Sequence, residues 1–541
     1  MPRPALTILQ RWRAPSLPLH RTINGNAVVA QAAHVRPSPF RERNQLHRQR
    51  QHQCRTLLTL AIETSCDDTC VALLSKDPGT HGRATLHFHR KITSDSTAYG
   101  GVYPPVALRS HDASLAPLIA EALTSLPAAA GEVQNNDDGD SIQKVGKGGG
   151  RTHAEEVGSS RHNTLTVAGT LRQKPDFVTV TRGPGMSANL ASGLSTAKGL
   201  ATAWQVPLLA VNHMQAHALT PRLVSALARQ DPTTSTASSS TTTSSSSPTA
   251  DVTAAIKPEY PFLTLLVSGG HTQLVHSHSL ASHRILASSS NIAVGDALDK
   301  AARHILPPDM LASHGDVMYG ALLERFAFPD SLPPFSTPSP DPKRQHDYDY
   351  DYEYTPPLRR VDEIAPYAAP APYSWTLHPP LSASRALSYE FNGLGSEVRK
   401  IATSKGDSMS LDERRILARA TMRLLFEHLA TRIFLAHAAE PELKDALKTL
   451  VVSGGVASNR FLMHVLRKML DVRGFEHVEI TAPPPALCTD NAVMIAWTGM
   501  EMYEAGWESL LSVHPERKWS IDPSSEEGGI LGVPGWRRRE H

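Results

Sequence analysis

Two histidines stand four residues apart in the segment His213-Met-Gln-Ala-His217, directly after the apolar run 206–211. If this segment is helical, both side chains lie on one face, and their ring nitrogens can share one metal ion. Met214 occupies the position at which an HExxH metalloprotease carries its general-base glutamate. The pair is therefore predicted to bind or orient a ligand rather than to cleave peptides. The alternative is two histidines on a polar helix face.

A third metal ligand must come from elsewhere in the chain. Asp490 follows the strand-like segment 478–481 and a loop that contains three consecutive prolines, and it precedes an apolar helical pattern. A carboxylate at the end of a strand can complete a site with two imidazoles. His213, His217 and Asp490 are therefore the predicted metal ligands.

A seven-residue pattern occurs twice: Thr264-Leu-Leu-Val-Ser-Gly-Gly270 returns as Thr449-Leu-Val-Val-Ser-Gly-Gly455. Each copy is an apolar strand pattern ending in a glycine turn, whose backbone N–H groups can approach a phosphate without obstruction by a Cβ atom. The two loops are predicted to lie in two halves of the chain and to hold one phosphorylated ligand between two lobes. Two ordinary tight turns are the alternative.

Two further elements belong to the predicted site. Asp299 lies on a helical pattern that starts near residue 291 and could accept hydrogen bonds from ribose hydroxyls, or it belongs to a surface helix with paired charges. The apolar runs 56–62 and 70–74 flank the polar turn 63–69. Strand, turn and strand predict a hairpin whose tip presents hydroxyls and carboxylates.

Composition divides the chain into folded and unfolded parts. Residues 130–165 and 230–256 are polar and poor in aliphatic side chains, so they cannot bury enough surface to offset their ordering entropy. They are predicted to be disordered insertions, the second of low complexity. Residues 328–383 carry many prolines and the acidic repeat 347–354, and are predicted to be a third disordered insertion, a solvated acidic loop.

The first 55 residues have the composition of a mitochondrial transit peptide. They contain ten of the 54 basic residues, all arginine, and one of the 52 acidic residues, without a long apolar run. A disordered basic tail is the alternative. Without this segment the formal charge changes from +2 to −7, so that any nucleic-acid site must be a local patch. Four scattered cysteines predict a reducing compartment, and no apolar run reaches about 20 residues, so a soluble protein without a membrane partner is expected.

Taken in order, these motifs resemble the tRNA N6-adenosine threonylcarbamoyltransferases of the TsaD type, formerly called glycoproteases or O-sialoglycoprotein endopeptidases. The first 55 residues resemble the presequence of the mitochondrial member, which works as a homodimer in the matrix. The resemblance covers nearly all of the predicted core and rests on nine ordered segments: 62–68, 100–102, 182–185, 212–217, 267–272, 295–300, 391–394, 453–460 and 488–491.

The resemblance implies an α/β fold of the actin-like ATPase class, in which two ribonuclease-H-like lobes enclose a nucleotide cleft. On this basis residues 56–229 form the first lobe and residues 257–541 the second, with the last helices returning to the first lobe. The implied cofactor is one divalent ion per subunit, zinc or iron, bound by His213, His217 and Asp490.

The implied substrate is threonylcarbamoyl-adenylate, supplied by an upstream synthase. The enzyme transfers the threonylcarbamoyl group to N6 of the adenosine 3′ to the anticodon in mitochondrial tRNAs that read A-initial codons, and it releases AMP. No general base is identified; Asp68 is the candidate catalytic residue, together with the turn 63–67. The positions that match the family's substrate-binding residues are Leu266, Val267, Ser268, Gly269, Gly270, Asp299, Gly320 and Asn459.

Three departures from the family pattern affect ligand loops. The segment 317–321 stands where the family commonly has Pro-Gly-Gly-Pro, which weakens the assignment of Gly320; Pro105 replaces an acid, and Asn392 replaces a serine. Two other functions remain open at this point. One is a zinc endopeptidase, which the residue at position 214 argues against, and the other is a non-catalytic, actin-like nucleotide-binding protein.

Overall fold

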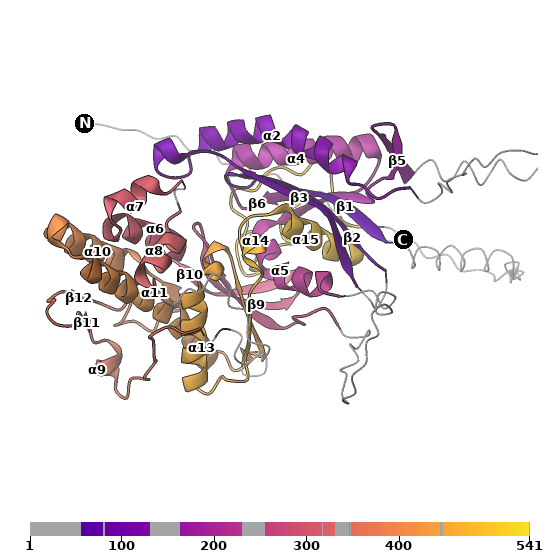
Figure 1. The fold of residues 1–541 in the computed structure, drawn as a ribbon. Coiled ribbons are helices and arrows are strands. Elements are labelled where there is room, and N and C mark those ends of the chain that lie inside the picture. The colour runs from indigo at the N-terminus through magenta and orange to yellow at the C-terminus, as the bar shows by residue number, and fades with distance from the viewer. Residues whose placement is uncertain are drawn as a thin grey trace, which may run out of the picture. The chain divides into compact units, whose positions relative to one another are not determined.

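The structure, a computed structural model, describes residues 56–78, 82–129, 163–229, 255–315, 318–329, 346, 348–443 and 447–539. The predicted transit peptide lies outside the described residues, as do residues 130–162 of the first predicted insertion and 230–254 of the second. The predictions for these segments therefore stay predictions. The described part is built on two mixed β-sheets with helices against their faces (Figure 1).

The first sheet has seven strands in the order β17-β16-β7-β6-β1-β2-β3. Strands β1, β2 and β3 form an antiparallel meander, which confirms the predicted hairpin, and β6 and β7 add to β1 in parallel. The strands are β1 (Leu57–Glu63), β2 (Asp68–Lys76), β3 (Ala84–Thr93), β6 (Phe177–Gly183), β7 (Leu208–Asn212), β16 (Trp507–Ser509) and β17 (Trp536–Arg538).

The second sheet repeats this arrangement. Its order is β13-β10-β9-β8-β14-β15, in which β8, β9 and β10 form an antiparallel meander and β14 and β15 add to β8 in parallel. The order β3-β2-β1-β6-β7 thus recurs as β10-β9-β8-β14-β15, as predicted for two ribonuclease-H-like lobes. The strands are β8 (Phe262–Val267), β9 (Thr272–Ser279), β10 (Ser282–Ser289), β13 (Ser388–Tyr389), β14 (Thr449–Ser453) and β15 (Glu479–Thr481).

This topology corrects the prediction for the two Ser-Gly-Gly loops. They follow β8 and β14, which are neighbouring parallel strands of the second sheet, with Ser453 paired to Leu266. Because the carboxyl ends of parallel strands meet at one edge of a sheet, both loops lie side by side in one lobe. The prediction that they belong to two halves and clamp a ligand between the lobes is therefore wrong.

Four helices cover the two faces of the first sheet. Helices α2 (Pro104–Thr124) and α4 (Ser187–Trp204) contact β2 and β6 on one face, and α15 (Ala492–Glu504) contacts β1 and β2. Helix α5 (His213–Leu227) contacts α15 and also β8 and β14 of the second sheet. Figure 1 shows α5 and α15 between the two sheets. From the C-terminal part of the chain, α15 packs against the first sheet, and β16 and β17 belong to it.

The remaining helices lie in the second lobe, where α11 contacts α6, α8 and α13 around the largest apolar cluster. Helix α11 begins at an N-cap, because the Ser410 side chain accepts a hydrogen bond from the Glu413 N–H group. No described helix is long and apolar enough to cross a membrane. These helices are α6 (Val294–Ile305), α7 (Pro308–Ser313), α8 (Gly320–Ala327), α9 (Arg360–Glu363), α10 (Asn392–Lys405), α11 (Leu411–Ala439), α13 (Arg460–Val472) and α14 (Pro485–Cys488).

Three short 3-10 helices and two small hairpins complete the described fold. The 3-10 helices are η2 (Thr97–Tyr99), η5 (Gly406–Ser408) and η6 (Gly455–Ser458), and the hairpins pair β4 (Thr164–Val167) with β5 (Thr170–Gln173) and β11 (Tyr367–Ala368) with β12 (Thr376–Leu377).

Residues 328–383 were the third predicted insertion. The prediction of a disordered acidic loop is wrong for residues 348–383. Tyr350 and Tyr352 are buried in the core of the second lobe, whereas Asp349, Asp351 and Glu353 between and beside them are exposed. Each buried phenol donates a hydrogen bond to a carboxylate, Tyr350 to Glu324 at 2.8 Å and Tyr352 to Glu427 at 3.0 Å. Alternating acids and tyrosines therefore form a segment whose tyrosines are buried on one side while its acids face solvent.

Candidate metal centre

The two histidines open helix α5. Strand β7 ends at Asn212, whose side-chain oxygen accepts hydrogen bonds from the N–H groups of Met214 and Gln215 at 2.9 and 3.1 Å. This is an N-cap, so the first residue of the helix is His213 and His217 lies one turn later on the same face. The helical spacing predicted for the pair is thereby observed, and both rings are buried.

Asp490 reaches the histidines from the other end of the chain. Its neighbour Asn491 caps α15 by accepting a hydrogen bond from the N–H group of Met494, and the Asn491 amide donates to the carbonyl of Thr489 at 2.8 Å. The carbonyl of Asp490 itself accepts a bond from the thiol of Cys70. The chain is thus fixed on both sides of the carboxylate, which enters the space in front of the histidines.

The three predicted ligand atoms converge on one point. The Nε2 atoms of His213 and His217 are 3.2 Å apart, and the Oδ1 atom of Asp490 lies 3.4 Å from the first and 3.1 Å from the second. Atoms that bind one tetrahedral zinc ion at about 2.1 Å are roughly 3.3 Å from one another. Two imidazoles and a carboxylate also suit zinc or iron, so that the residues fit one divalent ion.

Glu63 fixes the orientation of the first histidine. Its Oε2 atom lies 3.1 Å from Nδ1 of His213, and the Ser65 hydroxyl lies 3.3 Å from the same nitrogen. The carboxylate is fully buried and also accepts a hydrogen bond from Thr181. A proton held on Nδ1 by a carboxylate leaves the lone pair of Nε2 free for a metal ion. Sequence reasoning named Glu63 only as part of a turn that could supply a base, not as the partner of a ligand.

The electrostatics of the cluster favour a cation at its centre. Burial alone would lower the pKa of His213, but the carboxylates of Asp490 and Glu63 raise it to about 10. Burial opposes ionisation of Asp490, yet His213 and His217 hold its pKa well below the usual range. Beside them, burial and then the charges of the two histidines lower the pKa of His271 to about 4. His271 is therefore a neutral imidazole at this site, and sequence reasoning did not single it out.

Asp68, the predicted catalytic residue, is already engaged by two side chains. Its carboxylate accepts hydrogen bonds from Thr93 at 2.5 Å and from the Lys91 ammonium at 3.0 Å. Burial raises the pKa of Asp68, although both partners oppose this. Lys91 also donates to the hydroxyl of Thr489, next to Asp490, at 3.2 Å. The structure therefore brings Asp68 near the metal centre through Lys91, while its role as a base stays a prediction.

The predicted substrate loops meet next to the end of β8. Leu266 and Val267 have buried side chains, so that only their backbone and the turn after them can face a ligand, whereas Gly269 and Gly270 are exposed. The turn is compact because the Ser268 hydroxyl accepts hydrogen bonds from the N–H groups of Gly270 and His271.

Two glycines allow neighbouring segments to approach this turn. A Cβ atom on Gly295, at the start of α6, would lie 2.7 Å from the carbonyl oxygen of Ser268. A Cβ atom on Gly454, which has a φ of 101°, would lie 2.4 Å from the carbonyl oxygen of Val267. The turn after β8, the start of α6 and the turn after β14 therefore pack backbone against backbone.

The other predicted substrate residues lie on helices or at their starts: Asp299 is within α6, Gly320 is the first residue of α8, and Asn459 is the N-cap of α13. The Oδ1 atom of Asp299 accepts hydrogen bonds from the N–H groups of Tyr319 and Gly320 at 2.7 and 2.9 Å, so the structure places Gly320 beside Asp299. Burial raises the pKa of Asp299 to about 6, although these two bonds oppose the shift. Asn459 is buried and caps α13 by accepting from the N–H group of Leu462 at 2.9 Å. Their contacts with a substrate stay predictions.

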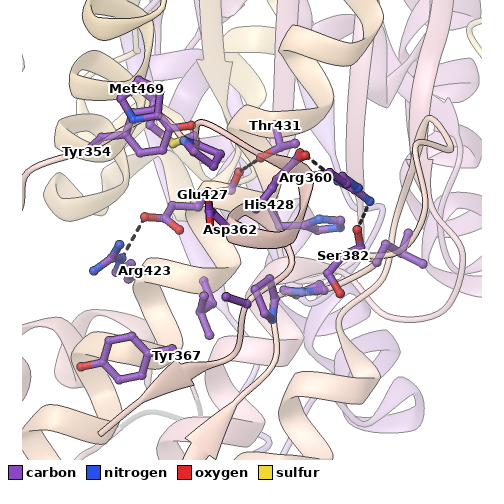
Figure 2. A pocket seen from close by; sticks show the side chains of 18 of the residues that line it. Tyr354, Arg360, Asp362, Tyr367, Ser382, Arg423, Glu427, His428, Thr431 and Met469 are labelled. Carbon is purple, nitrogen blue, oxygen red and sulfur yellow. Dashed lines mark hydrogen bonds and ion pairs between the residues drawn. The ribbon is translucent and has the colours of Figure 1, made fainter. Parts of the chain in front are cut away.

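A separate cavity of about 480 Å³ lies between the segment 354–384 and helix α11. None of the predicted metal or substrate residues lines it. Figure 2 shows its polar side chains meeting one another, with Arg423 facing Glu427 at 2.8 Å and Arg360 reaching the carbonyl of Ser382. Arg432 is likewise bound to the carbonyl of Ser388 at 3.0 Å. We assign no ligand to this cavity.

Comparisons with known proteins agree with the geometry. The family model of TsaD, tRNA N6-adenosine threonylcarbamoyltransferase, matches residues 143–247, 248–332 and 356–497. The mitochondrial tRNA N6-adenosine threonylcarbamoyltransferase of Schizosaccharomyces pombe is 32% identical over 501 residues, which are 90% of this chain and 90% of that protein. The tRNA N6-adenosine threonylcarbamoyltransferase of Rhizobium leguminosarum bv. trifolii is 28% identical over 481 residues, 87% of this chain and 96% of that protein.

Among solved structures, full-length HypF in its phosphate- and nucleotide-bound form is 9% identical and has a TM-score of 0.35, covering 84% of this chain and 47% of that one. This likeness is too distant to carry an argument. The family relationship therefore rests on sequence and the fold on the strand order.

Proposed function

Because the chain belongs to the TsaD family of tRNA N6-adenosine threonylcarbamoyltransferases, we propose that it transfers the threonylcarbamoyl group of threonylcarbamoyl-adenylate to the adenosine 3′ to the anticodon. The substrates are tRNAs that read A-initial codons, and the second product is AMP. The observation that carries the proposal is the convergence of His213, His217 and Asp490 beside the turns that follow β8 and β14.

His213, His217 and Asp490 would hold one zinc or iron ion, which supplies Lewis-acid polarisation of the carbamoyl carbonyl. The chain's own residues position the reactants. Glu63 keeps the proton of His213 on Nδ1, and the carboxylate of Asp299 is the proposed acceptor for the ribose hydroxyls. Holding both reactants in one geometry is the main rate contribution expected of such a site.

In the reaction, N6 of the adenine forms a bond to the carbamoyl carbon, and the bond between that carbon and the phosphate oxygen breaks. AMP leaves with the electron pair of that bond, so its phosphate needs hydrogen-bond donors. We assign this task to the turn 268–270, whose glycines leave space for a phosphate. The N–H group of Gly269 is the proposed donor, since those of Ser268 and Gly270 are bonded within the turn. N6 must lose a proton, and Asp68 is the proposed acceptor because Lys91 links it to Thr489 beside Asp490 and burial raises its pKa.

We place the protein in the mitochondrial matrix. A mitochondrial location is supported by the name of the Schizosaccharomyces pombe relative and by the arginine-rich, acid-poor residues 1–55. We further propose that the protein acts as a homodimer and receives its adenylate from a separate synthase, since the adenylate is a reactive mixed anhydride that must be made close to its use.

The test is to incubate the purified protein with threonylcarbamoyl-adenylate and unmodified tRNA, and to analyse the nucleosides by mass spectrometry. Threonylcarbamoyladenosine should form with the wild type and be lost in His213→Ala and Asp490→Ala, with metal content by elemental analysis falling in parallel. Thermal unfolding shows whether the variants fold. Absence of product from folded, metal-loaded wild type would contradict the proposal. Cleavage of a protein substrate in the same preparations would instead favour an endopeptidase, although Met214 offers no general base.

A further inference from the structure

Two tyrosines form an exposed stack at the start of helix α2. The ring centroids of Tyr99 and Tyr103 are 4.1 Å apart with an interplanar angle of 15°, and the residues are 56% and 40% exposed. Val102 between them is 44% exposed. Large aromatic residues usually bury most of their surface, so that an exposed, stacked pair points to a ligand that can stack on it.

The stack is held in place by its own loop. Ser96 accepts a hydrogen bond from the N–H group of Tyr103 through its hydroxyl at 3.3 Å and from that of Tyr99 through its carbonyl at 2.9 Å. Gly100 follows with a φ of 65°, a conformation that glycine adopts without strain. Because the rings are ordered before any partner arrives, binding to them costs little conformational entropy.

The loop is anchored to the turn that touches the metal centre. The N–H group of Ser94 donates to the carbonyl of Asp67 at 3.0 Å, and Nε2 of His111 on α2 donates to the carbonyl of Cys66 at 3.0 Å. The same turn contains Ser65, whose hydroxyl lies 3.3 Å from Nδ1 of His213. The loop that carries the tyrosines is therefore linked by hydrogen bonds to the turn beside the candidate metal centre.

The chemistry of this surface favours a ring rather than a phosphate. Helix N-termini usually bind anions through free N–H groups, but the first two residues of α2 are Pro104 and Pro105. The next two N–H groups already donate to the carbonyl of Tyr103. Asp95 is also exposed nearby, accepts hydrogen bonds from Thr97 and would repel a phosphate.

We propose that the stack of Tyr99 and Tyr103 is a platform for an unpaired base of the tRNA anticodon loop, next to the adenosine that is modified. This inference rests on the proposed function, which brings the anticodon loop to the metal centre. Proteins that recognise single-stranded RNA commonly stack its bases on aromatic side chains. A base on the outer face of either tyrosine extends the existing stack and helps to hold the neighbouring adenosine in the site.

The test compares Tyr99→Ala, Tyr103→Ala and Tyr103→Phe with wild type in the full-length protein. Affinity for an anticodon stem-loop RNA is measured by fluorescence anisotropy at several salt concentrations, and KM is measured separately for tRNA and for threonylcarbamoyl-adenylate. Leu171→Ala is the matched control, because Leu171 is a 43% exposed apolar residue of the β4–β5 hairpin.

Each alanine variant should weaken RNA binding and raise KM for tRNA roughly 5- to 100-fold, the range measured for loss of one base–aromatic stack. KM for the adenylate and the salt dependence of RNA binding should stay unchanged, because no phosphate contact is removed. Tyr103→Phe and Leu171→Ala should behave like wild type.

Unchanged RNA affinity in both alanine variants, with wild type active, would overturn the inference but not the proposed function. A shift in oligomeric state with unchanged RNA affinity would also overturn it and assign the surface to a second copy of the chain. If wild type itself forms no modified nucleoside, the proposed function fails first.

Discussion

The Nδ1 atom of His213 lies 3.1 Å from the Oε2 atom of Glu63, and the pair joins the first helix residue of α5 to the last residue of β1. The other nitrogen of the same ring faces Asp490 at 3.4 Å. The imidazole of His213 thus lies between the buried carboxylate of Glu63 on one side and the carboxylate of Asp490 on the other. Partners of this kind set the tautomer and basicity of a ligand, so that their loss affects metal affinity although they do not bind the metal.

We expect Glu63→Gln to weaken metal binding about 10- to 100-fold while leaving all three ligands in place. The amide keeps the size of the side chain but loses the charge that holds the Nδ1 proton. Competition with a fluorescent chelator measures the affinity. Glu121→Gln is the control, since Glu121 forms only an exposed ion pair with Arg90. Equal metal affinity in Glu63→Gln and wild type would show that the carboxylate has no part in ligand orientation.

Gly295→Ala should destabilise the fold by about 1–3 kcal/mol and weaken adenylate binding, because the added Cβ atom would lie 2.7 Å from the carbonyl oxygen of Ser268. The backbone of α6 or of the turn 268–270 must shift to make room. Gly199→Ala on α4 is the matched control, since no atom other than those of its chain neighbours and its own helix backbone lies within 4 Å of the position of its Cβ. That change should stabilise the protein by up to about 1 kcal/mol.

Urea unfolding measures both effects, and titration with AMP measures ligand affinity. If Gly295→Ala is as stable as Gly199→Ala, the close approach of α6 to this turn does not exist in solution.

Lys91→Ala should lower the free energy of unfolding by about 1 kcal/mol, since it leaves the buried carboxylate of Asp68 without its cation. The figure is modest because the Lys91 side chain is 33% exposed and therefore screened by solvent. Lys300→Ala, which removes an exposed pair with Asp296 on one helix face, should cost at most about 0.5 kcal/mol. Equal losses in the two variants, measured in urea, would contradict a specific role for the pair of Lys91 and Asp68.

Binding of AMP should weaken as the pH falls from 7.5 to 5. Burial raises the pKa of Asp299 to about 6, so in this range the carboxylate gains a proton and loses acceptor capacity for ribose hydroxyls. The contribution of Asp299 to the free energy of unfolding changes with pH in the opposite direction. Between pH 4 and 6, roughly, the folded state binds more protons than the unfolded state, so the contribution of Asp299 to stability falls as the pH rises.

Isothermal titration with AMP at a series of pH values measures the first effect, and urea unfolding measures the second. Asp299→Asn should bind AMP weakly at every pH and lose both dependences, whereas Asp296→Asn on the same helix should retain them. A binding profile that is flat in wild type would remove Asp299 from the nucleotide site.

The clustering of His213, His217 and Asp490 could be predicted from sequence because the position of each depends on a local rule. His213 and His217 have the spacing of one helix turn, and Asp490 follows a strand and a stiff loop. The partner of His213 could not be predicted in this way, because Glu63 meets it only after β1, β6 and β7 have paired. Lys91 belongs to no sequence motif, so its contact with Thr489 could not be predicted. This contact depends on the register of β2 and β3.

Two wrong predictions have physical causes that the sequence partly contained. The repeated Ser-Gly-Gly pattern indicates two similar strand ends, but a repeat does not show whether two strands belong to one sheet or to two. In the segment 347–354, acids and tyrosines alternate with a period of two, which is the pattern of an extended chain with one buried side. Composition alone favoured a solvated loop, and the buried Tyr350 and Tyr352 show that the periodicity was the better guide.

The position of Asp490 has one more consequence. It lies where the chain leaves the second sheet after β15 and passes to α15 against the first sheet, whereas both histidines follow β7 of the first sheet. An ion bound by all three residues would therefore link the segment before α15 to the start of α5. If the proposed ion binds there, its removal should loosen the connection between β15 and α15, and hydrogen exchange and proteolysis over residues 482–491 should then increase.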